Sequence, residues 1–170
     1  VSLAIYDTLL SYNVPKLSIK WPNDIMSAEK KICGILIETT FSHLEIKNTI
    51  IGIGLNVAMP SLAAQEIDQA WTDLQAQSPS PISRNTLTAK LVVTLFVLLK
   101  DFQRVGFKAY RDEWEEADLL KNLPGTVRTV KEGISGVVLG VDDSGALRLA
   151  LPDGEVQRFI GGELSLGPSL

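Results

Sequence analysis

The sequence contains only one cysteine among its 170 residues, Cys33, and an intramolecular disulfide is therefore excluded. Such sparse cysteine use is typical of a reducing compartment, so we expect the protein in the cytoplasm. Basic residues are outnumbered as well: 16 Lys and Arg stand against 20 Asp and Glu, which gives a net charge of −4. This balance argues against a nucleic-acid-binding face, and we expect no DNA binding from this chain.

Long apolar runs are also missing. The longest strongly apolar stretch, residues 91–99, is too short to span a bilayer and contains Thr94. No signal peptide is visible, so we expect no membrane partner. The sequence starts with Val1, already in a helix-like pattern, and we expect it to be a fragment or a processed product of a longer protein.

The first part of the chain predicts a mixture of helices and strands. Apolar residues at helical spacing predict a helix over residues 2–12, and Ser83 is a plausible N-cap for a long helix that ends at Gly106. A shorter helix is expected over residues 107–117 and some helix around 63–70. The predicted strands are 17–21, 25–27, 31–39, 44–47 and 49–55, with a hairpin turn at residues 28–30.

The pattern changes at residue 123. From there short strands alternate with turns such as Asp153-Gly154, which is typical of a small antiparallel barrel. The strands are expected at residues 126–131, 134–141, 146–151 and 155–160. The sequence therefore predicts an α+β domain over residues 1–122, in which a mixed sheet packs with helices, followed by a small all-β domain over residues 123–170.

One turn carries more polar groups than a turn requires. The run Lys20-Trp21-Pro22-Asn23-Asp24 is followed seven residues later by Lys31, at the start of an Ile-rich strand. Two cations, an amide and a carboxylate thus gather between segments that read as buried strands. A phosphate-bearing ligand would account for this composition, since a Lys in a water-poor site stabilises charge that develops on phosphate.

Three blocks of the sequence together resemble the biotin–protein ligase family. They are the run from Lys20 to Asp24, Lys31-x-x-Gly34, and the strand that ends Gly52-Ile53-Gly54-Leu55-Asn56. The closing run from Gly161 to Leu166 resembles the end of that family's C-terminal domain. The resemblance covers essentially the whole chain. It implies a catalytic domain like that of class II synthetases, followed by an SH3-like barrel.

The same resemblance implies an ATP-dependent ligase. Such enzymes join biotin and ATP into biotinyl-5′-AMP, with Mg²⁺, and pass biotin to a lysine of a biotin carboxyl carrier protein. Lys31 is the first candidate for the catalytic lysine at the biotin carboxylate and the α-phosphate. Asn23 and Asn56 offer amide groups to the nucleotide, and Gly34 allows close approach of the backbone. Asp24 is expected either to orient Lys20 or Lys31 or to help hold Mg²⁺.

The sequence also departs from the family pattern. The glycine- and arginine-rich loop that precedes the Trp-Pro-Asn-Asp block in the family is absent, and Gly167 stands where the family often has a basic residue. We therefore expect the isolated chain to be inactive or nearly so. Its incomplete sheet is expected to expose an edge and apolar surface, which would favour a homodimer.

Two alternatives remain open at this stage. A lipoate or octanoate acyltransferase of the same general fold would use a nucleophilic cysteine beside a lysine. Lys31 and Cys33 are two residues apart on a predicted strand, where i and i+2 share a face. The other alternative is a non-catalytic binding or dimerisation module.

Overall fold

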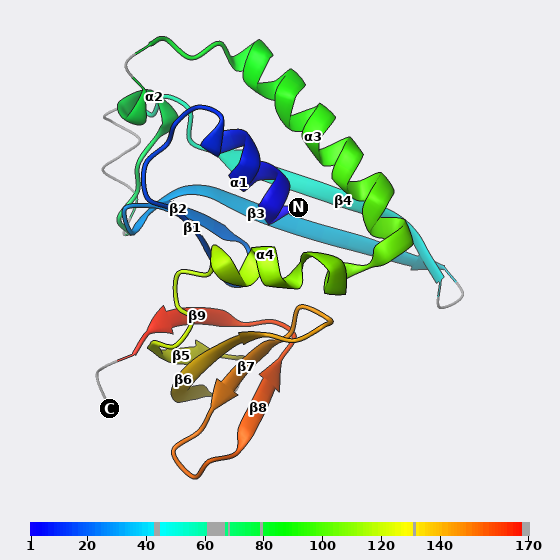
Figure 1. The fold of residues 1–170 in the computed structure, drawn as a ribbon, viewed down its shortest axis with the longest axis vertical. Helices are drawn as coiled ribbons and strands as arrows, with labels where there is room; N and C mark the ends of the chain where they lie inside the picture. The colour runs from blue at the N-terminus through cyan, green and yellow to red at the C-terminus, as the bar shows by residue number, and fades with distance from the viewer. Residues whose placement is uncertain (43–44, 61–66, 68, 79, 131, 168–170) are drawn as a thin grey trace. The chain divides into compact units, whose positions relative to one another are not determined.

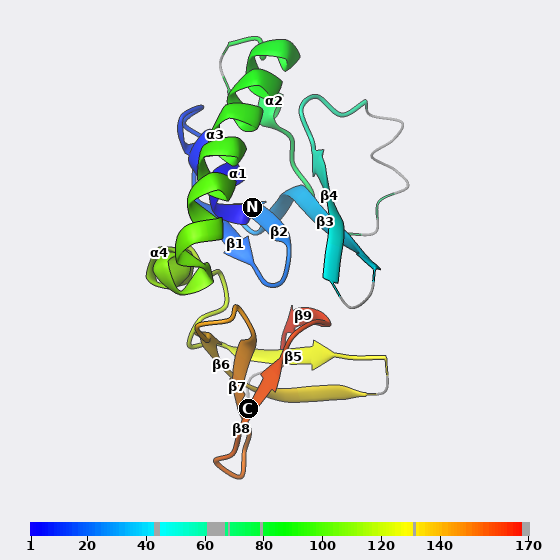
Figure 2. The ribbon, with the colours of Figure 1, turned by 90° about the vertical axis from the view of Figure 1, so that its right-hand side faces the viewer.

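The computed structural model describes residues 1–42, 45–60, 67, 69–78, 80–130 and 132–167. The chain forms two compact units (Figures 1 and 2). The first comprises residues 1–17 and 23–94, and the second comprises residues 18–22 and 95–170. The predicted division into residues 1–122 and 123–170 stays a prediction. The helix expected around residues 63–70 lies largely outside the described residues.

The first unit contains an antiparallel sheet with the strand order β2-β3-β4. Its strands are β2 (Asp24–Ser27), β3 (Lys30–Ser42) and β4 (Glu45–Leu55). Helix α1 (Ser2–Leu10) contacts β2 and buries Leu3, Ile5 and Leu9 (Figure 1). The burial of residues at this spacing confirms the helical pattern read from the sequence.

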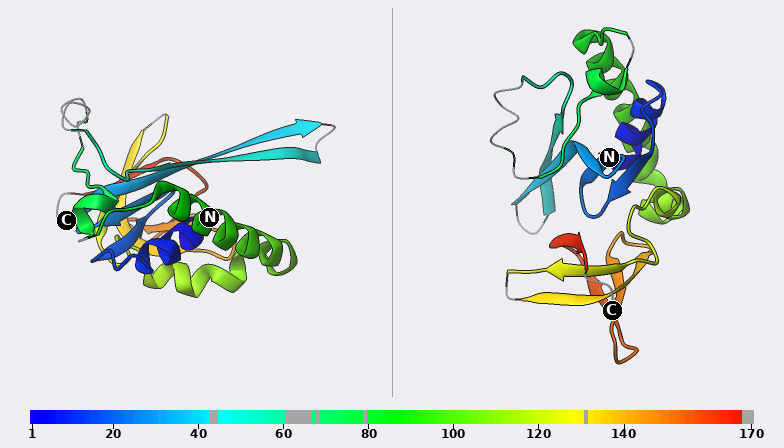
Figure 3. Two further views of the ribbon diagram at one scale, coloured as in Figure 1. Left: turned by 90° about the horizontal axis from the view of Figure 1, so that it is seen from above. Right: turned by 90° about the vertical axis from the view of Figure 1, so that its left-hand side faces the viewer.

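The β3–β4 hairpin is longer than predicted. The strands expected at residues 44–47 and 49–55 are parts of one strand, β4, which pairs with β3 from Ser42↔Glu45 to Cys33↔Leu55. The hairpin runs well past the end of β2, which pairs only with residues 30–34 (Figure 3). Beyond β2, large apolar side chains are exposed on both faces, including Leu36, Ile37 and Ile50. This is the exposed apolar surface that the sequence predicts.

Helix α3 (Arg84–Val105) has the limits that the sequence predicts. The Ser83 hydroxyl accepts a hydrogen bond from the Thr86 N–H at 3.3 Å, which caps the helix. Gly106 follows the last turn with φ of 70°, a conformation that favours glycine. No helix in the described part of the chain is long and apolar enough to cross a membrane.

The second unit is built on a five-stranded antiparallel sheet with the order β8-β7-β6-β5-β9 (Figure 2). Its strands are β5 (Pro124–Arg128), β6 (Gly133–Val141), β7 (Leu147–Ala150), β8 (Val156–Phe159) and β9 (Glu163–Leu166). Residues that face inward alternate with more exposed ones along the strands. The core that they form includes Val127, Val138, Leu147, Leu149 and Leu164. Four of these strands were predicted, whereas β9 was not.

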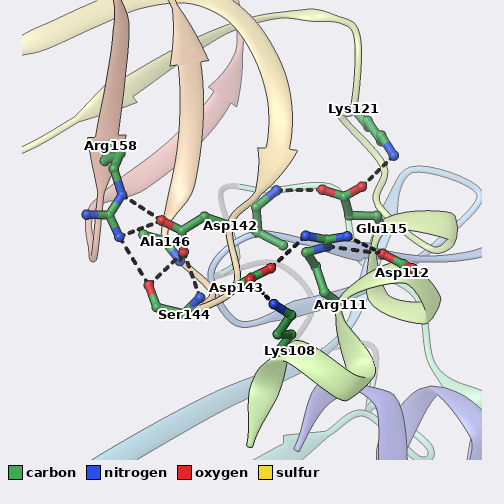
Figure 4. A network of polar contacts seen from close by, with 11 residues as sticks. Lys108, Arg111, Asp112, Glu115, Lys121, Asp142, Asp143, Ser144, Ala146 and Arg158 are labelled. Atoms are coloured by element: carbon green, nitrogen blue, oxygen red, sulfur yellow. Dashed lines mark hydrogen bonds and ion pairs between the residues drawn. The ribbon is translucent and has the colours of Figure 1, made fainter.

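The rest of the second unit precedes this sheet. Strand β1 (Leu17–Lys20) starts at the unit boundary, and Ile19 forms a parallel bridge with Asp118. The 3₁₀ helix η2 (Phe107–Tyr110) leads directly into α4 (Arg111–Glu116). The Glu115 carboxylate joins α4 to the sheet, because it accepts from the Val141 N–H at 3.1 Å and from the Lys121 ammonium at 2.6 Å (Figure 4).

The partly buried carboxylate of Asp118 destabilises this unit when it is ionised. Its Oδ1 accepts from the Leu120 N–H at 3.0 Å, but its buried Oδ2 has no hydrogen-bond partner among the described residues. Burial, assisted by the nearby Glu115 carboxylate, raises the pKa of Asp118 to about 6. The folded state therefore holds this proton more tightly than the unfolded chain. Protonated Asp118 therefore stabilises the folded state relative to ionised Asp118. This stabilisation is complete below about pH 4 and is lost as the pH rises through about 6.

We predict that Asp118→Asn raises the free energy of unfolding at pH 8 by about 1–2 kcal/mol. This value is smaller than the pKa shift alone would give, because Asp118 is partly exposed and solvent screens its charge. It should also flatten the dependence of stability on pH between about 4 and 7. Urea denaturation at a series of pH values measures both effects. Asp153→Asn is the matched control, because exposed Asp153 makes the same type of bond to the Glu155 N–H at 3.0 Å. Equal effects of the two substitutions would contradict the explanation.

Candidate active site

The Lys31 side chain is held at a fixed place on the sheet of the first unit. Its Nζ lies 2.8 Å from Asp24 Oδ1, and the two side chains are only 26% and 18% exposed. Of the two lysines considered as partners of Asp24, Lys31 is thus the one that pairs with it. An ammonium has three donors, so two remain for a ligand after this ion pair.

Gly34 provides the space for this ion pair. Asp24 lies directly opposite Gly34 in the β2–β3 register. A Cβ added at Gly34 would come within 3.1 Å of Lys31 Cε and 3.3 Å of Lys31 Nζ. The missing side chain therefore allows the lysine to lie across the strand toward Asp24.

A β-bulge determines which face of β3 carries the lysine. Met26 pairs with Lys31 but Ile25 pairs with Cys33, so β3 has an extra residue, Ile32, at this point. Ile32 and Cys33 are consequently buried in succession, and the alternation of faces is interrupted. The Lys31 ammonium lies beside Gly34, the residue after Cys33, and not on the face of the cysteine. The shared face proposed for Lys31 and Cys33 from their spacing is therefore wrong.

Cys33 is also unsuited to nucleophilic attack. Its side chain is 1% exposed. Burial, together with the negative charge of Asp24, raises the pKa of the thiol to about 12. Because the thiolate is the reactive form, this cysteine stays protonated and unreactive near neutral pH.

Asn23 fixes the start of β2 against β3. Its Nδ2 donates to the Ile35 carbonyl at 2.6 Å, and its own carbonyl accepts from the Ile35 N–H at 2.9 Å. The amide therefore uses a donor within the protein and retains its carbonyl oxygen, Oδ1, as an acceptor. The second N–H of Nδ2 remains for an acceptor such as a phosphate oxygen, and Oδ1 remains for a ligand N–H group.

Asn56 connects β3 to the segment that follows β4. Its Nδ2 donates to the Thr72 carbonyl at 3.1 Å and lies 3.5 Å from the Lys31 carbonyl. The same segment pairs with Lys31 through the backbone: the Lys31 N–H donates to Ala70, and the Thr72 N–H donates to Lys31, both at 2.9 Å. Asn56 thereby helps to fix the main chain from which the Lys31 side chain extends.

The segment from Ala70 to Asp73 was not identified from the sequence. Asp73 caps helix α2 (Leu74–Gln77) through the Ala76 N–H at 2.7 Å, and it also accepts from the Met59 N–H at 2.9 Å. The only sequence signal for it was an Asp placed to cap the run Leu74-Gln75-Ala76-Gln77. The pairing of residues 70–72 with Lys31 joins parts of the chain that are distant in sequence, and no local sequence pattern indicates it.

Trp21 belongs to the second unit and has a packing role there. It is 4% exposed, and its indole N–H donates to the Gly145 carbonyl at 3.3 Å. Such burial is typical of a residue that packs in a core. The bond between Trp21 and Pro22 is cis.

The residues of this site do not form a magnesium site on their own. Among the described residues, no group of three or more His, Cys, Asp and Glu side chains could hold a metal ion. Asp24 supplies one carboxylate, and that carboxylate already pairs with Lys31.

Two family models match the chain, each over one part of it. Residues 2–56 match the biotin/lipoate A/B protein ligase family, and residues 126–167 match the biotin protein ligase C-terminal domain. The first match contains Asn23, Asp24, Lys31, Gly34 and Asn56. The second contains the strands of the second unit from β6 to β9 and most of β5.

Curated relatives agree with these matches. The bifunctional ligase/repressor BirA of Escherichia coli is 32% identical over 166 residues, which cover 98% of this chain and 51% of the relative. The biotin–[acetyl-CoA-carboxylase] ligase of Paracoccus denitrificans is 30% identical over 157 residues, which cover 65% of that relative. The chain thus spans about half the length of the BirA proteins that it matches.

Solved structures agree with the predicted fold class. The biotin protein ligase of Aquifex aeolicus is 26% identical and aligns with a TM-score of 0.82 over 98% of this chain and 72% of that one. The same protein in complex with biotin and ATP aligns with a TM-score of 0.79. The prediction of an α+β domain followed by a small all-β domain is confirmed.

Proposed function

Because the chain belongs to the biotin protein ligase family, we propose that it forms part of an ATP-dependent enzyme that attaches biotin to a protein lysine. The observation that carries this proposal is the position of Lys31, whose ammonium is held by Asp24 beside a glycine and is largely shielded from solvent. The substrates are biotin, ATP and a biotin carboxyl carrier protein, and the compartment is the cytoplasm. DNA is not a substrate or partner of these residues.

The first step joins two anions. A biotin carboxylate oxygen attacks the α-phosphorus of ATP, the bond from that phosphorus to the bridging oxygen breaks, and pyrophosphate leaves with the electron pair. The Lys31 ammonium reduces the repulsion between the carboxylate and the phosphate, and it stabilises the charge that builds on the phosphate oxygens. Asp24 orients this ammonium and leaves two of its donors for the ligand.

The second step transfers the acyl group. The acceptor lysine, as a free amine, attacks the acyl carbon of biotinyl-AMP, the carbon–oxygen bond breaks, and AMP leaves while the nitrogen loses a proton. No covalent intermediate with the protein is required. Lys31 remains beside the departing phosphate and stabilises it in this step as well.

Asn23, Asn56 and Gly34 have supporting roles in this proposal. Gly34 gives the lysine and the ligand access to the sheet surface. The amide oxygens of Asn23 and Asn56 can accept from a nucleotide amino group, because the hydrogen bonds that each amide makes within the protein use only its nitrogen. Magnesium would arrive with the ATP phosphates, and no step depends on a metal ion held by these residues.

Adenylate formation tests the proposal directly. The full-length protein, given biotin and α-labelled ATP, should produce labelled biotinyl-AMP and release pyrophosphate. The 170-residue chain alone is expected to produce none, because it corresponds to about half of a ligase such as BirA. Absence of product from the full-length protein would contradict the function, and product from the 170-residue chain would contradict the expected inactivity.

Cys33→Ala distinguishes the ligase from a cysteine-dependent acyltransferase. We predict that the variant retains its rate of biotin transfer within about twofold, since an unreactive buried thiol contributes only packing. Thermal unfolding of the variant controls for a loss of folded protein. A loss of transfer activity in a fully folded variant would favour the acyltransferase.

A second copy of this chain is a further proposed partner. The exposed apolar residues of the β3–β4 hairpin, including Leu36 and Ile50, support self-association. Size-exclusion chromatography with light scattering at increasing protein concentration measures it.

A further inference from the structure

The second unit contains a pocket that is not part of the candidate active site. It has a volume of about 380 Å³ and lies between α4, the β6–β7 turn and strands β7 and β8. Its lining is dominated by charge: three arginines (Arg111, Arg148 and Arg158) and two aspartates (Asp142 and Asp143), with Ser144 and Val141. Figure 4 shows most of these side chains.

Each aspartate of the pocket already has basic partners. Asp142 accepts from Arg158 Nε at 2.6 Å and from the Ser144 hydroxyl at 2.6 Å. Asp143 lies 2.6 Å from Arg111 Nη1 and 2.9 Å from Lys108 Nζ (Figure 4). Hydrogen bonds from Ser144, aided by Arg158, hold the pKa of Asp142 below its usual range. Both carboxylates are therefore charged, and their role is to orient Arg158 and Arg111.

Arg148 is the unbalanced charge of the pocket. It lies directly opposite Arg158 in the β7–β8 register, where like charges destabilise a sheet. The structure gives the Arg148 side chain no hydrogen bond or ion pair with any residue that it describes, although this side chain is only partly exposed. An arginine carries five N–H donors, and none of those of Arg148 is used by another described residue.

Arg158 adds further donors on the same side. Its Nε and Nη2 bind Asp142 and Ser144, whereas Nη1 has no partner within the described part of the chain. Two adjacent guanidinium groups with free N–H bonds are the arrangement that binds phosphate oxygens in pairs. An anion at this place would also remove the repulsion between the two arginines.

We propose that this pocket binds a compact phosphate anion, of the size of inorganic phosphate or pyrophosphate, between Arg148 and Arg158. The volume falls at the lower end of the range for small-molecule sites. The lining offers one apolar side chain, Val141, which is itself 2% exposed, and therefore no apolar side chain for a lipid chain to pack against. The inference stands independently of the proposed function.

Calorimetric titration tests this site. Phosphate and pyrophosphate are titrated separately into the full-length protein carrying Lys31→Gln, which removes the active-site cation, in the presence of a chelator. Pyrophosphate should bind, and Arg148→Gln should weaken its affinity by about tenfold or more. Arg128→Gln is the matched control, because Arg128 is an exposed arginine of β5 outside the pocket and should leave the affinity unchanged.

Three results would overturn the proposal. The first is that neither phosphate nor pyrophosphate binds. The second is that the Arg148→Gln and Arg128→Gln variants bind pyrophosphate with equal affinity. The third is that a short aspartate peptide binds more tightly than pyrophosphate. The last result would assign the pocket to a protein carboxylate. Circular dichroism on both variants shows that they are folded, which the Arg148→Gln variant should be, since it loses a like-charge contact.

Discussion

Replacing Lys31 by glutamine should reduce the rate of biotinyl-AMP formation by about 1000-fold while leaving the protein folded. Glutamine retains a donor and much of the length of the lysine but cannot neutralise the carboxylate and the α-phosphate. The effect should fall on kcat, because the charge on the phosphate oxygens grows in the transition state. Single-turnover measurement of labelled adenylate isolates this step from product release.

Lys30→Gln is the matched control for this substitution. Lys30 precedes Lys31 on β3 and is exposed, so it has the same chemistry in the adjacent position without the contact to Asp24. Its loss should change the rate by less than about twofold. Comparable losses in the two variants would mean that the rate depends on the overall positive charge of this hairpin and that Lys31 has no specific catalytic role.

A second large effect is expected at Gly136, in the middle of β6. A Cβ at this position would overlap the carbonyl oxygen of Ala150 and lie 2.9 Å from Leu149 Cγ on the neighbouring strand β7. The main chain of β7 cannot yield without breaking its pairing with β6 and β8. We therefore predict that Gly136→Ala lowers the free energy of unfolding by about 3 kcal/mol.

Gly133→Ala provides the comparison on the same strand. A Cβ at Gly133 would have its nearest contact at 3.5 Å, with Thr126 Cγ2, which is an ordinary distance. Its effect on urea denaturation should stay within about 0.5 kcal/mol. If Gly136→Ala were as well tolerated, the β6–β7 pairing described for the second unit would be wrong.

Elements that depend on local patterns were predicted well from the sequence. The long helix α3 has a serine cap at Ser83 and a glycine stop at Gly106, and both signals lie within the helix or next to it. The β2–β3 turn at Ala28 and Glu29 was recognised in the same way. The ligand-binding roles of Lys31 and Asp24 stay predictions from the resemblance, and the structure adds the ion pair between the two side chains.

Features that depend on distant partners were not predicted. Strand β9 forms by pairing with β5, some forty residues earlier in the chain. The bulge at Ile32 depends on the register with β2, and it moved Lys31 and Cys33 to different faces. The hydrogen bonds of the Asn56 amide to main-chain carbonyls likewise required the position of the segment around Thr72. None of these pairings has a signal within one stretch of sequence.

The position of the Lys31 ammonium relative to the reacting atoms is the central claim, and a crystal structure of the full-length protein with biotinyl-AMP measures it. We expect Lys31 Nζ within about 3 Å of an oxygen of the acyl-phosphate group, with Asp24 still on its other side. A ligand bound elsewhere, with Lys31 in contact only with Asp24, would contradict the account.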